Sequence, residues 1–291
     1  MSTANPKSAV SNFLSLVKFS HTIFAMPFAV IGYLLAVEFT PAVFSWKLFG
    51  LVIGCMVFAR SAAMAFNRYI DRDIDAANAR TVVREIPAGI IGAKSALVFV
   101  IVSSLLFIAT TFFINRICFY LSPVALLVIL GYSYTKRFTA LCHLVLGVGL
   151  ALAPIGAWLA VTGYFDRLPL FYSFAVLSWV SGFDIIYALQ DEEFDRSKKL
   201  NSIPVLLGKK GALLFSRVLH LCSAGLIVYA GYYAEFTLWY WFGALVFCGL
   251  LVYQHTLVKP TDLSRVNLAF FTTNGIASVA FSVFVIMELY A

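Results

Sequence analysis

The sequence predicts an all-α, polytopic membrane protein with about nine transmembrane helices. Of its 291 residues, 62% are hydrophobic and only 12% are charged, whereas soluble domains are about 45–50% apolar and about 25% charged. The apolar residues gather into runs of about 20, the length of helix that crosses a bilayer. We expect these runs to be helices because lipid offers no partners to the backbone groups of an isolated strand.

Nine apolar runs follow one another along the chain. They lie at roughly 17–38, 48–70, 95–114, 117–135, 139–162, 169–190, 211–233, 236–258 and 265–289. Most connections between them are a few residues long, so we expect a single transmembrane domain spanning residues 1–291. The N-terminus lacks the ordered basic, apolar and small-residue segments of a cleaved signal peptide, and we expect none.

The basic residues predict the orientation. Sixteen Lys and Arg residues fall on the side of the N-terminus and three on the opposite side, leaving out Arg60 and Arg217 within the runs. Cytoplasmic loops of membrane proteins carry such an excess. We therefore place the N-terminus and the two long loops, about 71–94 and 191–210, on the cytoplasmic side of the inner membrane. The bilayer is the expected partner, with no nucleic acid and no obligate protein partner.

The first long loop begins with a ladder of polar residues. Asn67, Asp71 and Asp75 recur every four residues at the end of the second run, which places them on one helix face. A solvated helix end is the simpler interpretation, but Asn67 lies a turn deeper in the apolar run, where an amide needs a partner. Mg²⁺ prefers oxygen ligands and usually binds one or two carboxylates plus substrate phosphates. Three arginines that suit bidentate contacts with diphosphate oxygens follow closely: Arg72, Arg80 and Arg84.

The second long loop repeats this spacing. Tyr187, Asp191 and Asp195 end the sixth run, and Asp191 lies 120 residues after Asp71. An ordinary charged loop would explain either motif alone. Because both motifs lie on the same predicted membrane face, we predict one shared metal–diphosphate site. Its predicted Mg²⁺ ligands are Asn67, Asp71, Asp75, Asp191 and Asp195.

Taken together, the two motifs make this chain similar to the UbiA superfamily of intramembrane prenyltransferases over essentially its whole length. The spans, the two Asp-rich loops and their order all resemble that family. Arg84, Pro87 and Gly89 resemble the family's R-x-(I/L)-P-x-G segment. The resemblance implies helices around a central cavity.

Two further segments carry the resemblance. KFSHT at 18–22 resembles the basic segment of the first helix at which members bind substrate, and YTKR at 134–137 resembles the Y-(S/T)-K-R element near the diphosphate. The chain departs from the family at Arg68, where many members carry Asp. This leaves one carboxylate fewer, so we place Arg68 and Asp73 on the flanks of the site.

The activity implied by the resemblance is Mg²⁺-dependent transfer of a polyprenyl group from polyprenyl diphosphate to a ring carbon of an aromatic acid, in respiratory quinone synthesis. The sequence looks most similar to bacterial members that prenylate 4-hydroxybenzoate. A naphthoate prenyltransferase of menaquinone synthesis is the alternative. An ion-coupled transporter is less favoured, because the acids cluster at one membrane face rather than at the midplane.

The resemblance also implies roles for single residues. Asp71, Asp191 and Tyr187 are the expected catalytic residues, and the rings of Tyr187 and Tyr134 are candidates to stabilise an allylic carbocation. The residues expected to bind diphosphate are Arg72, Arg84, Lys136, Arg137 and Lys198.

An aromatic acid also needs a cationic anchor, for which the sequence offers Lys18, His21 and Arg60. Each has another interpretation. Lys18 would extend to the membrane interface, and His21 would be a hydrogen-bonded residue inside the bundle. Arg60, several residues inside a run, would pair with an acid such as Asp184.

Overall fold

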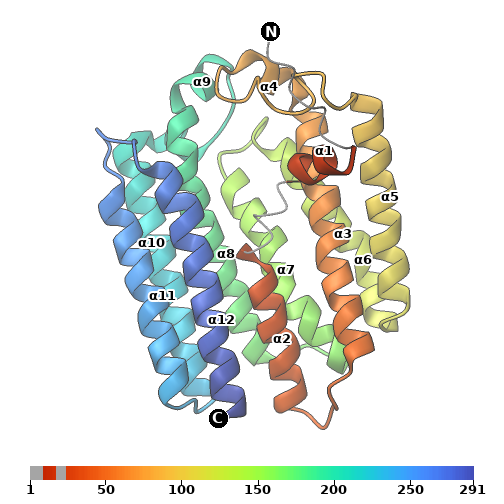
Figure 1. Ribbon diagram of the computed structural model, residues 1–291. Helices are drawn as coiled ribbons and strands as arrows, with labels where there is room; N and C mark the ends of the chain where they lie inside the picture. Colours follow the sequence, from red (N-terminus) through yellow and green to blue (C-terminus); the bar gives the residue numbers. More distant parts are fainter. Residues whose placement is uncertain (1–8, 18–23) are drawn as a thin grey trace.

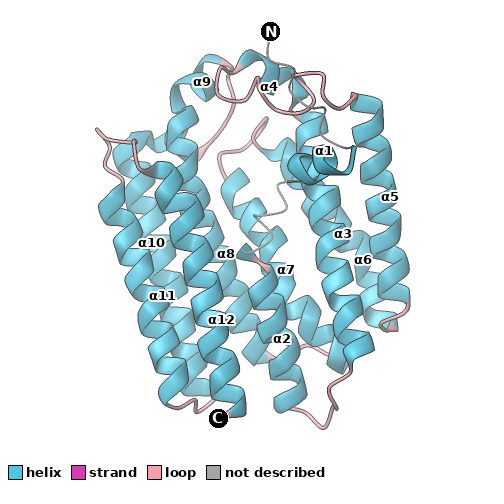
Figure 2. Cartoon of the chain, in the orientation of Figure 1, coloured by secondary structure: helices cyan, strands magenta, loops and turns pink. Residues whose placement is uncertain are grey.

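A computed structural model describes residues 9–17 and 24–291 as a bundle of helices (Figure 1). Among these residues there is no β-strand, as Figure 2 shows, and the only bridge joins Lys259 and Asp262. Eight helices are long and apolar enough to cross a membrane, and a further apolar helix has 13 residues. The predicted all-α membrane protein is confirmed. The count differs from nine because this shorter helix fills only part of the predicted run 17–38.

The helices follow the predicted runs closely. In chain order they are α1 (Ala9–Leu16), α2 (Met26–Glu38), α3 (Trp46–Ile70), α4 (Arg72–Ala77), α5 (Ala93–Phe112), α6 (Arg116–Thr135), α7 (Cys142–Thr162), α8 (Arg167–Ala188), the 3₁₀ turn η2 (Leu189–Asp191), α9 (Glu192–Ser197), α10 (Ile203–Tyr233), α11 (Leu238–Leu257), the π-helical turn η3 (Leu268–Thr273) and α12 (Asn274–Tyr290).

The second long loop is shorter than predicted because α10 begins early. Ser202 caps this helix: its Oγ accepts a hydrogen bond from the backbone N of Val205 at 3.4 Å, and Pro204 lies in the first turn. Both residues favour a helix start. Gly208 then interrupts the helix with a φ of 68°. The apolar run that the sequence shows therefore begins only after this kink.

An aromatic core joins α2, α8, α11 and α12. Phe28, Trp179, Phe247 and Phe281 are buried, and the ring centroids of their contacting pairs lie 5.4 to 6.4 Å apart. The indole Nε1 of Trp179 donates to Oδ1 of Asn274 at 2.9 Å, so its polar atom is satisfied. Figure 1 shows α10, α11 and α12 on one side of the bundle, α3, α5 and α6 on the other, and α4 and α9 together at one end.

A close helix crossing gives a prediction about stability. A Cβ atom on Gly32 of α2 would lie 2.2 Å from the backbone O of Pro154 in α7, whereas one on Gly50 would meet nothing within 4 Å. Because a backbone atom cannot turn aside, Gly32→Ala should force the helices apart and destabilise the protein by about 1–3 kcal/mol. Thermal unfolding in detergent measures this, with Gly50→Ala as the matched control. Equal melting temperatures for the two variants would contradict the crossing.

Candidate active site

Both acidic motifs lie at the same end of the bundle, where α3 and α8 leave the apolar region (Figure 1). The first motif continues from α3 into the short helix α4, and the second continues from α8 through η2 into α9. The helical spacing of four residues is kept across both junctions. The side chains of both motifs face one polar cavity of about 480 Å³.

Nine of the predicted site residues line this cavity. They are Arg60, Asn67, Asp71, Asp75, Arg84, Lys136, Tyr187, Asp191 and Asp195. Asp71 and Asp75 are each only 4% exposed. Two carboxylates this deeply buried need partners, because an unpaired buried charge is strongly unfavourable.

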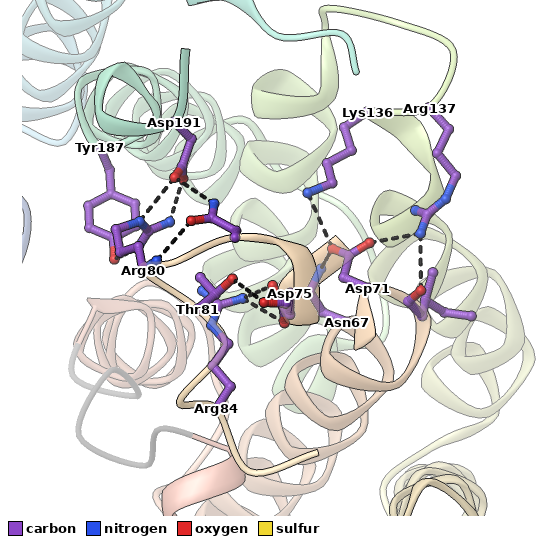
Figure 3. A network of polar contacts seen from close by, with 12 residues as sticks. Asn67, Asp71, Asp75, Arg80, Thr81, Arg84, Lys136, Arg137, Tyr187 and Asp191 are labelled. Carbon is purple, nitrogen blue, oxygen red and sulfur yellow. Dashed lines mark hydrogen bonds and ion pairs between the residues drawn. The ribbon is translucent and has the colours of Figure 1, made fainter. Parts of the chain in front are cut away.

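The partners of the first motif are cationic (Figure 3). Oδ1 of Asp71 accepts a hydrogen bond from Arg137 at 2.9 Å, and its Oδ2 lies 3.6 Å from Nζ of Lys136. Nδ2 of Asn67 donates to Oδ2 of the same carboxylate at 3.2 Å. NH1 of Arg84 lies 2.7 and 2.9 Å from the two carboxylate oxygens of Asp75. Of these basic groups, Arg84 and Lys136 line the cavity, where an anionic ligand would lie, whereas Arg137 does not.

Arg80 joins the two halves of the site, as Figure 3 shows. It forms a bidentate ion pair with Asp191, in which its Nε donates to Oδ1 at 3.0 Å, and its NH1 donates to the Tyr187 hydroxyl at 2.9 Å. Asn78 also donates to Oδ1 of Asp191, at 3.2 Å. Burial alone would lower the pKa of Arg80, but the hydrogen bond and charge of Asp191 outweigh it and raise the pKa. Arg80 therefore stays charged and ties the first loop to the second.

Other predicted site residues lie elsewhere. Arg72 donates from NH1 to the backbone O of Tyr69 at 2.8 Å and does not line the polar cavity. Lys198 is exposed and does not line it either. Their binding of diphosphate stays a prediction. Lys18 and His21 lie outside the described residues.

Arg60 lines the polar cavity, but it does not pair with Asp184. Oδ2 of Asp184 instead lies 2.7 Å from Nδ1 of His143, a residue of α7. The Nε atom of Arg60 is buried and has no hydrogen-bond partner among the described residues. Of the two interpretations of Arg60, this geometry favours a place in the site.

The position of Arg68 was predicted wrongly. Its side chain is not on the flank: it is 4% exposed and lines the polar cavity beside Asn67. Arg68 follows Arg60 by eight residues and Met64 by four, and all three line the cavity. A spacing of four on a helix gives one common face, so this inward face was visible in the sequence.

A second, apolar cavity of about 360 Å³ adjoins the polar one. Its walls come largely from α3, α6 and α7. Five residues line both cavities: Arg60, Met64, Tyr132, Leu146 and Leu150. The two cavities therefore meet along this shared wall, and together they suit a molecule with an anionic head and a long apolar chain.

The donor chemistry of the polar cavity suits Mg²⁺. The carboxylates and the Asn67 amide offer the oxygen ligands that this ion prefers. Within the described ranges, no three His, Cys, Asp or Glu side chains converge closely enough to hold a metal alone. Mg²⁺ sites commonly combine one or two carboxylates with the oxygens of a bound phosphate, and the acids of this cavity suit such a site.

Comparison with known proteins agrees with this geometry. The UbiA prenyltransferase family matches residues 25–276. The chain is 30% identical over 223 residues to the 4-hydroxybenzoate octaprenyltransferase of Tolumonas auensis, covering 77% of this chain and 78% of that protein. It is 31% identical over 229 residues to the protein of the same name from Nitrosomonas europaea, covering 78% and 77%.

Solved structures share the fold. A UbiA homolog from Aeropyrum pernix superposes with a TM-score of 0.84 at 31% identity, covering 92% of this chain and 98% of that chain. A UbiA homolog from Archaeoglobus fulgidus bound to DMAPP and Mg²⁺ superposes with a TM-score of 0.72 at 20% identity, covering 96% and 99%. With a family match over most of its length and the same helical fold, this chain belongs to the UbiA prenyltransferase family.

Proposed function

We propose that this prenyltransferase moves a polyprenyl group from polyprenyl diphosphate to an aromatic ring carbon of a hydroxybenzoate-type acid, in respiratory quinone synthesis. The observation that carries the proposal is the junction of the two cavities. The polar cavity suits a diphosphate and the apolar one suits a prenyl chain, so the bond between them falls at the wall shared by Arg60 and Tyr132. The relatives named 4-hydroxybenzoate octaprenyltransferase support the choice of acceptor.

The diphosphate binds among the cations that surround the acids. Arg84, Lys136 and Arg137 each contact an Asp carboxylate of the first motif, and Arg84 and Lys136 line the cavity in which the diphosphate would lie. The residues that would hold Mg²⁺ are Asn67, Asp71, Asp75, Asp191 and Asp195, and the Archaeoglobus homolog bound to DMAPP and Mg²⁺ supports this choice of ion. When bound, Mg²⁺ supplies positive charge to the departing diphosphate.

The reaction breaks the allylic C–O bond and leaves a carbocation at the prenyl chain. Tyr187 is the group we propose to stabilise it. Its ring packs on Phe270, with centroids 4.2 Å apart, and its hydroxyl accepts a hydrogen bond from Arg80. The guanidinium carbon of Arg80 also lies over this ring, 5.2 Å from its centroid, so Arg80 must move aside before the ring can face the carbocation. An aromatic face attracts a cation, more strongly where water is excluded. The ring carbon of the acceptor then forms the C–C bond, and its proton leaves as the ring regains aromaticity.

The carboxylate of the acceptor binds Arg60. This guanidinium lies at the junction of the cavities, with its Nε atom lacking a hydrogen-bond partner in the described part of the chain. Arg60→Gln should raise the KM for the aromatic acid on the order of 10- to 100-fold, the worth of one charge-assisted hydrogen bond, and leave the KM for polyprenyl diphosphate nearly unchanged.

Steady-state kinetics in membranes measures both constants. Arg217→Gln is the matched control, because Arg217 is exposed on α10 and lines neither cavity. An unchanged KM for the acid in Arg60→Gln would rule out this anchor.

Product analysis tests the acceptor class directly. Membranes containing the protein receive polyprenyl diphosphate, Mg²⁺, 4-hydroxybenzoate and a dihydroxynaphthoate in equal amounts, and mass spectrometry identifies the prenylated product. Prenylated hydroxybenzoate is the expected result. Prenylated naphthoate alone would assign the protein to menaquinone synthesis. The family match already favours a transferase over an ion-coupled transporter.

We also propose that residues 1–291 form one transmembrane domain in the inner membrane, with the end that carries α4 and α9 in the cytoplasm. The excess of Lys and Arg at this end supports that orientation. It would place the polar cavity where a water-soluble aromatic acid can reach it.

A further inference from the structure

The cations of the polar cavity fall into two groups. Three of them contact an acid: Arg80 pairs with Asp191, Arg84 with Asp75, and Lys136 with Asp71. The other two are Arg60 and Arg68, for which the described residues provide no ion pair within 4.0 Å. A cation of the first group must give up its ion pair before it can bind an anionic substrate. A cation of the second group has no such ion pair to break among the described residues.

Arg68 is the more deeply buried of these two. Its side chain is 4% exposed, and neither Nε nor NH1 has a hydrogen-bond partner among the described residues. The charged groups that act on it are Arg84, Glu85 and Asp75. Asp75 is held by Arg84, and Glu85 accepts a hydrogen bond from Ser15 at 2.5 Å. A buried cation without an anion is energetically unfavourable. The Nε and NH1 groups of Arg68 therefore suit an anionic ligand in the cavity.

The position of Arg68 along α3 indicates which anion it meets. Arg60 and Arg68 share a helix face but lie eight residues apart, about 12 Å along the helix axis. Arg60 lines both cavities, whereas Arg68 lines only the polar one, next to Asn67. In the proposed function, the carboxylate of the acceptor binds Arg60 at the junction. The anion expected at the acidic end, near Arg68, is then the diphosphate.

We propose that Arg68 binds the diphosphate of the prenyl donor through its Nε and NH1 groups, which have no hydrogen-bond partner in the described part of the chain, and so sets the affinity of this chain for that substrate. This inference rests on the proposed function. Arg68 carries its positive charge whether or not a metal ion is bound. We therefore expect this site to hold a diphosphate to a measurable extent without a divalent ion.

Pyrophosphate binding tests the inference without any turnover. Isothermal titration calorimetry measures inorganic pyrophosphate binding to the full-length protein in detergent, with a chelator present. Arg68→Gln should raise the Kd on the order of 10- to 100-fold, because a charge-assisted contact is lost. Arg68→Lys, which keeps the charge but loses the planar fork, should lie between Arg68→Gln and the unaltered protein. Arg217→Gln should not change the Kd.

Kinetics separates the two arginines. Arg68→Gln should raise the KM for polyprenyl diphosphate and leave the KM for the aromatic acid unchanged, which is the reverse of Arg60→Gln. Equal pyrophosphate affinity in Arg68→Lys, Arg68→Gln and the unaltered protein would overturn the inference, as would a rise confined to the KM for the acid. If pyrophosphate binding depends on Arg68 but no prenylated product forms, the proposed function fails and the anion site stands.

Discussion

Asp191→Ala should reduce prenyl transfer on the order of 10²–10³-fold, the usual effect of losing one group that stabilises developing charge. Asp191 accepts hydrogen bonds from Arg80 and Asn78 and lines the polar cavity. Its removal takes away a proposed metal ligand and also leaves Arg80 without its acid. Asp71→Ala should have an effect of the same size, because Asp71 holds Lys136 and Arg137 in the first half of the site.

Product formation in membranes supplied with polyprenyl diphosphate, an aromatic acid and Mg²⁺ measures both variants. Glu193→Ala is the matched control for Asp191→Ala, since Glu193 lies two residues away on α9 but is exposed and does not line the cavity. It should transfer at nearly the normal rate. Near-normal transfer by either Asp variant would contradict a site shared by the two motifs.

The acidic motifs could be predicted because their geometry is local. A spacing of four residues places Asn67, Asp71 and Asp75 on one face wherever the helix lies in the fold. Both motifs also end apolar runs on the same predicted side of the membrane, so their meeting followed from topology. The structure brings both into one cavity.

Contacts between distant segments could not be predicted in this way. Arg80 was only one of several arginines behind the first motif, and its pairing with Asp191 joins residues 111 positions apart. In the same way, the sequence suggested Asp184 as a partner for Arg60, but Asp184 pairs with His143 of the neighbouring helix. Which acid pairs with which base depends on how the helices pack. The spacing of residues along one segment does not contain that information.

Arg68 shows a different kind of error. Its positive charge suggested a place outside a metal site, and this consideration outweighed the helical register. Yet Arg60, Met64 and Arg68 repeat every four residues, as the acids do, and all three line the cavity. For a helix end at a membrane surface, the periodicity was a better guide to position than the sign of the charge.

Removing Mg²⁺ with a chelator should reduce transfer at least on the order of 100-fold, and added Mg²⁺ should restore it. The physical reason is the charge of the polar cavity. Its described lining includes five acids, Asp71, Asp75, Asp184, Asp191 and Asp195, and five cations, Arg60, Arg68, Arg80, Arg84 and Lys136. With His143, which also lines the cavity, counted as neutral, their formal charges cancel, so the side chains have no excess positive charge for a departing diphosphate.

Binding and turnover should therefore respond differently to the chelator. Pyrophosphate should still bind weakly through Arg68, because no acid of the described residues forms an ion pair with that cation, while cleavage of the allylic bond should stop. Pyrophosphate binding and prenyl transfer should be measured in the same preparation, before and after Mg²⁺ is restored. This separates the effect of removing the ion from inactivation of the protein. Full transfer in the chelator would contradict the acids as metal ligands, because side chains of zero net charge would then have to stabilise the leaving group alone.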